Sequence, residues 1–324
     1  MNPYPLYQLM GVPLDLALEV HEILSGEGEI PGVSLEKTTF EHGVISTIRV
    51  LDERGESAMG KPRGTYVTLE SEALRTVDRT AHASLIAILS DTIKNMLDLP
   101  DTASVLCCGI GNPNVISDAL GPMTANRLTA TRSLFEIAPE MREGLREVSV
   151  IAPGVSGVTG IETAEILESL IDRIKPDCLI CVDALAAGSL SRLSATIQLA
   201  DTGIFPGSGV GSRRKPIDRQ TMGVPVLALG VPTVVHAGVI VHQAMEILTG
   251  HLEEVSSSSQ AYRDLQPPNI KTIIDRVLEP FDGHLTVTPK DVDEQIGNLV
   301  HIISGAITTA LHSGVNPEHL KWLP

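Results

Sequence analysis

Ala103-Ser-Val-Leu-Cys-Cys-Gly-Ile110 and Cys178-Leu-Ile-Cys-Val182 are the two stretches that decide the fold of this chain. Each is a short apolar run bounded by turn-forming residues. Runs of this kind, alternating with helical segments, are typical of strands buried in a parallel sheet. Both stretches are therefore predicted to be buried parallel strands.

The segments around these strands show helical and strand patterns in alternation. A helix is expected at about 118–135, a strand at 147–152 and a helix at 162–174. The resulting βαβαβ order predicts an α/β fold, in which a doubly wound, mostly parallel sheet forms the middle of three layers. Strands at about 194–200 and 224–230 are expected to extend this sheet.

The remaining segments add strands before this unit and a helix after it. The expected elements are a helix at 15–24, strands at 43–51 and 64–70, a helix at 81–97 and a last helix that ends near Gly314. Thr288 is placed to cap the last helix, with Pro289 at its first position. Residues 1–15 lack a regular apolar period, so we predict a single domain over 16–324, with a mobile loop at about 253–270.

Composition and charge exclude several classes of function. The 324 residues carry a net charge of −16, which argues against non-specific nucleic-acid binding and against an anionic membrane surface as a partner. No basic residue precedes Lys37, so a secretory signal is not expected. The longest apolar stretch, Val224 to Val241, contains Gly230 and Pro232 and is better interpreted as a strand, a turn and a helix start than as a membrane span. The four cysteines fall inside predicted strands, which favours buried reduced thiols, and the expected location is cytoplasmic.

Two aspartates follow the deciding strands in the same local sequence. Asp118-Ala-Leu120 comes after the first strand and its loop, and Asp183-Ala-Leu185 comes directly after the second. Ligands bind at the carboxyl ends of parallel strands, so both carboxylates are expected to face one crevice. Two carboxylates close together can share a proton and act as acid and base in hydrolysis. The alternative is that each aspartate caps the helix that follows it.

Other catalytic motifs are incomplete or missing in the sequence. Gly109-Ile-Gly-Asn-Pro-Asn114 lacks the third glycine of a dinucleotide fingerprint, and no P-loop is present. Gly154-Val-Ser-Gly157 and Gly207-Ser-Gly209 fall short of a serine nucleophile elbow. The histidines form no His-Glu-x-x-His pattern. The two aspartates are therefore the best candidates for catalysis, with no cofactor and no metal ligand assigned.

Long segments of this chain resemble the germination proteases of spore-forming bacteria, which are atypical aspartic endopeptidases. The resemblance covers about residues 7–312, and the segments that carry it include Met59–Glu70, Asp118–Pro122, Ala152–Val155, Thr159–Thr163, Val182–Ala186, Asp201–Ile204, Pro206–Gly211, Gly230–Val235 and Val287–Lys290. The resemblance implies that the substrates are small acid-soluble spore proteins, degraded in the spore interior during germination. It also implies a fold similar to that of the hydrogenase maturation proteases, and a homotetramer.

The same resemblance implies roles for particular residues. Asp118 and Asp183 match the catalytic aspartate pair. Asp15-Leu16-Ala17 matches the junction at which an inactive zymogen loses its pro-segment, here residues 1–15. The chain departs from the family pattern at Phe205, where a histidine is usual, and at His236, where an aspartate is usual.

Two other hypotheses stay open, one for a metal-dependent enzyme and one for a binding protein without activity. The maturation proteases use equivalent positions to bind a metal, so the same aspartates could hold a divalent ion, although two oxygens alone make a poor site. A catalytically silent binding form that keeps its pro-segment is the other alternative. Arg213 and Arg214 are candidates for binding an acidic residue of the substrate, and a solvated surface run is the competing interpretation.

Overall fold

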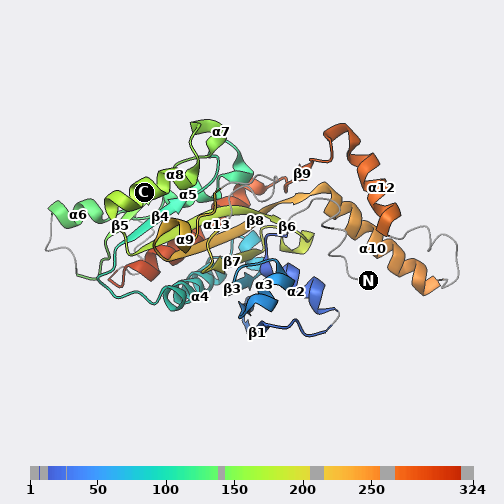
Figure 1. Ribbon diagram of the computed structural model, residues 1–324, viewed down its shortest axis with the longest axis horizontal. Helices are drawn as coiled ribbons and strands as arrows, with labels where there is room; N and C mark the ends of the chain where they lie inside the picture. Colours follow the sequence, from blue (N-terminus) through green and yellow to red (C-terminus); the bar gives the residue numbers. More distant parts are fainter. Residues whose placement is uncertain are drawn as a thin grey trace.

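A mixed sheet runs through the computed structural model, which describes residues 7, 14–26, 28–137, 143–204, 215–255 and 267–314 (Figure 1). Its strand order in this part of the chain is β1-β2-β3-β7-β8-β6-β4-β5, with β9 paired to β8. The strands are β1 (Val33–Phe40), β2 (Gly43–Val50), β3 (Gly64–Glu70), β4 (Val105–Gly109), β5 (Val148–Ile151), β6 (Cys178–Ala187), β7 (Thr196–Ala200), β8 (Val226–His236) and β9 (Thr286–Val287).

The two deciding stretches form neighbouring parallel strands in the middle of this sheet. In the pairing of β4 with β6, Val105 lies opposite Cys178 and Gly109 opposite Val182. Strand β5 pairs in parallel with β4, and β8 pairs in parallel with β6. The predicted α/β fold with a doubly wound parallel sheet is therefore confirmed for the half of the sheet formed by these four strands.

The other half of the sheet is antiparallel. Strand β7 pairs antiparallel with both β3 and β8, and β1, β2 and β3 form an antiparallel meander. The strands expected at 43–51 and 64–70 are present, but β1 was not predicted. Strand β1 is the edge of the sheet and is largely exposed, so its sequence lacks the apolar alternation that marks a half-buried strand.

Helices cover both faces of the sheet, which makes the expected three layers (Figure 1). On one face, α4 and α13 pack with α5 in a large apolar cluster, and α8 and α9 pack on the other. The helices are α2 (Ala17–Ser25), α3 (Glu53–Met59), α4 (Arg79–Leu97), α5 (Leu120–Ala125), α6 (Arg132–Ile137), α7 (Ser156–Thr159), α8 (Thr163–Ile174), α9 (Arg219–Met222), α10 (Ala237–Val255), α12 (Pro267–Leu278) and α13 (Val292–Leu311). Short 3₁₀ turns are η1 (Glu72–Arg75), η2 (Ile116–Asp118), η4 (Leu190–Arg192) and η6 (Glu279–Phe281).

Two helix predictions were wrong in detail. The helix expected at 118–135 is broken into η2, α5 and α6, because Thr131 leaves the helix to pair with the strand beside it: its N–H donates to the carbonyl of Val148. The last helix begins at Val292, not after a Thr288 cap. The hydroxyl of Thr288 donates instead to the carbonyl of Thr233, which holds this segment against β8.

Strand β8 continues past the glycine and proline at which a turn was expected. Pro232 pairs with Leu185, and the register with β6 shifts just after this pair, which accommodates the missing proline N–H. The carbonyl of Pro232 accepts from the N–H of Ser194 at 2.7 Å. Within the residues that the structure describes, no helix is both long enough and apolar enough to cross a membrane.

Part of the loop expected at 253–270 is helical. Helix α10 runs to Val255, and α12 begins at Pro267, where a proline fits because the first turn needs no N–H partner. Residues 256–266 lie outside the described part of the chain. The four cysteines are buried and free, in agreement with the expectation of reduced thiols.

Close contact between α5 and the strand ends predicts a severe effect for one substitution. A Cβ atom at Gly121 would lie 2.2 Å from the carbonyl oxygen of Ile110 and 2.4 Å from that of Val182. We expect Gly121→Ala to lower the free energy of unfolding by about 3 kcal/mol or more, because backbone would have to move. Urea unfolding followed by circular dichroism measures this change.

Gly297→Ala is the matched control. Gly297 lies in α13, and its added Cβ would meet no atom within 4 Å. This substitution should raise the free energy of unfolding by about 0.5–1 kcal/mol, since alanine has the higher helix propensity. Equal effects of the two substitutions would contradict the packing described here.

Candidate functional site

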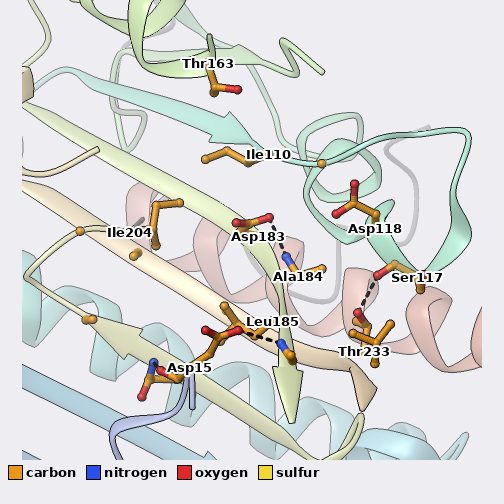
Figure 2. Close-up of a pocket in the computed structure, with 18 of the residues that line it drawn as sticks. Asp15, Ile110, Ser117, Asp118, Thr163, Asp183, Ala184, Leu185, Ile204 and Thr233 are labelled. Carbon is orange, nitrogen blue, oxygen red and sulfur yellow. Dashed lines mark hydrogen bonds between the residues drawn. The ribbon is translucent and has the colours of Figure 1, made fainter. Parts of the chain in front are cut away.

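A cavity of about 690 Å³ opens where the parallel strands β4 and β6 end. Asp118, Asp183 and Asp15 all line it, and they come from three distant parts of the sequence. Figure 2 shows the three side chains around this hollow, with Asp183 on its strand between the other two. The structure therefore brings together both aspartates of the expected pair and the aspartate of the expected processing junction.

Asp118 is held by the turn that follows β4. Its Oδ2 accepts a hydrogen bond of 2.7 Å from the backbone N–H of Asn112. Gly111 adopts a φ of +131°, and a Cβ there would lie 2.0 Å from the carbonyl oxygen of Asp118, so this turn requires glycine. The hydroxyl of Thr233 on β8 donates to the carbonyl of Ser117 at 2.6 Å. These contacts fix the backbone on which the Asp118 carboxyl group is mounted.

Asp183 is held by its strand. It lies opposite Gly230 of β8 and is the first residue of β6 beyond the point where β4 ends, because Gly109 pairs with Val182. Its Oδ1 accepts from the N–H of Ala184 at 2.9 Å. The carboxyl group therefore stands at the end of the parallel strands, as expected, although β6 itself continues to Ala187.

The helix-cap interpretation of these two aspartates is wrong. Asp183 is followed by more strand, so it has no helix to cap. Asp118 ends η2, and the residue that caps α5 is Ala119, which makes no side-chain cap. Both carboxyl groups face the cavity instead (Figure 2).

The expected processing junction crosses the same cavity. The carboxylate of Asp15 accepts from the N–H of Ala186 at 2.9 Å, and the ammonium group of Lys61 donates to the carbonyls of Leu14 and Asp15, each at 2.9 Å. The side-chain amide of Gln198 donates to the carbonyl of Asp15 at 3.4 Å and accepts from the N–H of Ala17 at 2.7 Å. Strand β7 and the loop before β3 thus hold residues 14–17 by the backbone of that segment, and β6 holds the side chain of Asp15.

Comparison with known proteins assigns the chain to a family. A family model described as germination protease matches residues 17–272 and 261–322. The germination protease of Caldanaerobacter subterraneus is 44% identical over 97% of this chain and 98% of its own. That of Clostridium tetani is 40% identical over 96% and 99% of the two chains, and that of Bacillus subtilis 35% over 94% of each.

The chain belongs to the germination protease family. The suspected resemblance is therefore confirmed, and the class of activity is that of a peptidase. Among solved structures, a [NiFe] hydrogenase maturation protease, HycI from Thermococcus kodakarensis, matches 45% of this chain and 80% of its own at 22% identity, with a TM-score of 0.30.

Behind the junction of this family member lies a buried group of charges. Glu19 on α2 is 3% exposed, and its carboxylate accepts from the N–H of Gly188. Arg192 lies 4.0 Å from Glu19 and makes closer contacts with Glu22 at 2.8 Å and Glu70 at 2.9 Å. Burial raises the pKa of Glu19 to about 7, against the smaller effects of Arg192 and the Gly188 N–H.

Sequence reasoning missed two of the residues that hold the junction, Lys61 and Gln198, and the buried Glu19 behind it. Lys61 lies inside the family segment Met59–Glu70, which assigns it no role, and neither Glu19 nor Gln198 belongs to a recognisable motif. The local sequence Gly60-Lys61-Pro62-Arg63-Gly64 marks a turn but does not distinguish Lys61 from its neighbour Arg63. Arg213, Arg214 and Phe205 lie outside the described residues.

His236, one of the departures from the family pattern, lies at the end of β8 and makes two hydrogen bonds. Its Nδ1 accepts from the N–H of Gly238 at 3.0 Å, so Nε2 carries the proton that is donated to the carbonyl of Gly283 at 2.9 Å. It thereby joins the end of β8 to the turn before β9. In the described part of the chain, no three His, Cys, Asp or Glu side chains gather in a way that could hold a metal ion.

The raised pKa of Glu19 predicts how stability depends on pH. The folded state favours the neutral form of the Glu19 carboxyl group. The contribution of this group to stability is therefore complete below its ordinary pKa of 4.5 and is lost as the pH rises through about 7. We expect the free energy of unfolding to fall between pH 5 and pH 8, by an amount on the order of 3 kcal/mol at most from this group. Glu19→Gln should remove this part of the fall.

Urea unfolding of the two proteins at pH 5 and pH 8 measures the difference. Glu22→Gln is the matched control, because Glu22 contacts the same Arg192 but its side chain is 41% exposed. Identical pH dependence in the wild type and Glu19→Gln would show that Glu19 does not titrate in this range.

Proposed function

We propose that this member of the family hydrolyses peptide bonds with Asp118 and Asp183 as an acid–base pair. The observation that carries the proposal is that two aspartates from separate strand ends, both in Asp-Ala-Leu sequences, line one cavity. The ionised carboxylate takes a proton from water while the water oxygen bonds to the peptide carbonyl carbon. The protonated carboxyl group then gives its proton to the leaving amide nitrogen as the C–N bond breaks.

The proposed substrates are small acid-soluble spore proteins, cut in the spore interior at the start of germination. The support for this is the family: curated relatives along nearly the whole chain are named germination proteases. Arg213 and Arg214 are proposed to bind an acidic residue of the substrate, on the ground of their charge in a chain of net charge −16.

We propose further that the chain is made as a zymogen and that residues 1–15 are its pro-segment. The support is the place of the junction: the carbonyls of Leu14 and Asp15 are bound inside the cavity that both aspartates line. A segment in this position excludes a protein substrate from the same place. Cutting it between Asp15 and Leu16 would open the cavity.

A homo-oligomer, and by family resemblance a tetramer, is also proposed. Helices α10 and α12 project from one end of the sheet (Figure 1). Large apolar side chains are exposed on these helices and on the turn that follows them: Ile247, Leu248, Ile273, Val277 and Phe281. An exposed apolar set on a projecting pair of helices supports an interface with another subunit.

Replacing either aspartate tests the acid–base pair. Asp118→Asn and Asp183→Asn are nearly isosteric but cannot exchange a proton, so each should lower the rate of proteolysis by about 100- to 10,000-fold. Cleavage of a purified small acid-soluble spore protein, followed by gel and mass spectrometry, measures the rate. Asp172→Asn, an exposed aspartate on α8, is the matched control and should cleave at the wild-type rate.

The same assay separates the alternatives. Wild-type rates in either purified variant would overturn the aspartate pair. Loss of activity on exhaustive chelation, restored by one divalent metal, would favour the metal-dependent maturation type of protease. A folded wild-type chain that cuts nothing would favour the silent binding form.

Mild acid is expected to release the pro-segment. A carboxylate pair acts as acid and base only when it holds one proton, and acidification supplies that proton. Intact-mass spectrometry of the acid-treated wild type should show a chain that begins at Leu16, and the Asp183→Asn chain should stay uncut. A wild-type chain that stays full length yet digests substrate would show that processing is not required.

A further inference from the structure

Lys61 lies in the turn between α3 and β3, and its ammonium group contacts the junction at residues 14 and 15. It follows α3, whose last turn is closed by the left-handed Gly60, and Pro62 comes next. The hydroxyl of Tyr66 donates to the carbonyl of Pro62 at 2.8 Å, which fixes the turn against β3. Burial lowers the pKa of Lys61, whereas the nearby carboxylates of Asp15 and Glu19 act in the opposite direction. The side chain lines the cavity that contains the aspartate pair.

The atoms that Lys61 binds are the carbonyl oxygens next to the proposed cut. Its ammonium group donates to the carbonyl of Asp15, which is the carbonyl of the Asp15–Leu16 bond, and to that of Leu14, both at 2.9 Å. Gln198 supplies a second, longer donor to the Asp15 carbonyl. The carbonyl to be attacked therefore faces two donors, one of which carries a positive charge.

Donors aimed at a peptide carbonyl stabilise the negative charge that its oxygen gains when water adds to the carbon. We propose that Lys61 is a catalytic residue that polarises the attacked carbonyl, with Gln198 as its second donor. This inference rests on the proposed function. As water adds, one aspartate accepts its proton and the Asp15 oxygen becomes an oxyanion bound by Lys61. The carbonyl re-forms as the C–N bond breaks and the other aspartate protonates the Leu16 nitrogen.

The same residue serves a substrate after the pro-segment has left. Removal of residues 1–15 takes both of these carbonyl acceptors away from Lys61. A partly buried ammonium group without acceptors is costly, so the opened cavity favours an incoming chain that places a carbonyl in the same position. Lys61 thus binds the cut carbonyl of the pro-segment first and that of a protein substrate afterwards.

Self-cleavage of the full chain tests this role. Lys61→Met keeps the unbranched shape and most of the length of the side chain and removes its charge, and we expect the rate of appearance of the chain that begins at Leu16 to fall about 100- to 1,000-fold under mild acid. Lys61→Arg keeps a cation with N–H donors and should recover at least about a tenth of the wild-type rate. Lys94→Met, on the exposed face of α4, is the matched control and should cut at the wild-type rate.

Hydrogen exchange separates catalysis from a purely structural clamp. Lys61→Met should keep the amide protection of Ala17 within about threefold of the wild type, because Gln198 and Ala186 still hold the segment. A wild-type rate in Lys61→Met overturns the inference, and so does a rate that falls only in proportion to lost protection.

Different results test the aspartate pair and the role of Lys61. If the wild type cuts itself and Asp183→Asn does not, the aspartate pair stands whatever Lys61→Met shows. A wild type that never cuts between Asp15 and Leu16 overturns the role of Lys61 and leaves the pair to be judged on added protein.

Discussion

The close packing of Gly121 against the end of β4 and the middle of β6 is the constraint on which the site depends. Its backbone lies against the carbonyl oxygens of Ile110 and Val182, so the chain leaving β4 turns tightly over the middle of β6. That turn brings Asp118 back to the edge where Asp183 stands. A side chain at position 121 would push the turn away from the sheet and would change the relation between the two carboxyl groups.

Around this site the protein accepts buried charge that an apolar core would avoid. Lys61, Glu19 and Arg192 all lose solvent, and each loss costs free energy that its hydrogen bonds offset in part. The apolar clusters on the two faces of the sheet stabilise the fold independently of these charges. The charges gather on the side of the cavity where residues 14–17 lie, which is consistent with a role in binding a peptide backbone.

The part of the fold that follows from local pattern was predicted well. Strands β4 and β6 and helix α8 have apolar residues in the order that burial requires, and clear turn residues at their ends. Prediction failed where pairing across the sheet decides the structure. Strand β1 forms because its backbone pairs with the edge of β2. The helix after Asp118 is broken because the N–H of Thr131 donates to the carbonyl of Val148.

The sequence by itself determined the parallel centre of the sheet, the family, and the choice of Asp118 and Asp183 as candidates, because each of these is marked by short local patterns along the chain. Only the tertiary structure decided that Asp15 reaches the same cavity and that Lys61 and Gln198 bind its carbonyl. Those two residues are 46 and 183 positions away from Asp15. Contacts over such separations leave no periodic pattern in the sequence, since they form only when the meander of β1, β2 and β3 folds against β7.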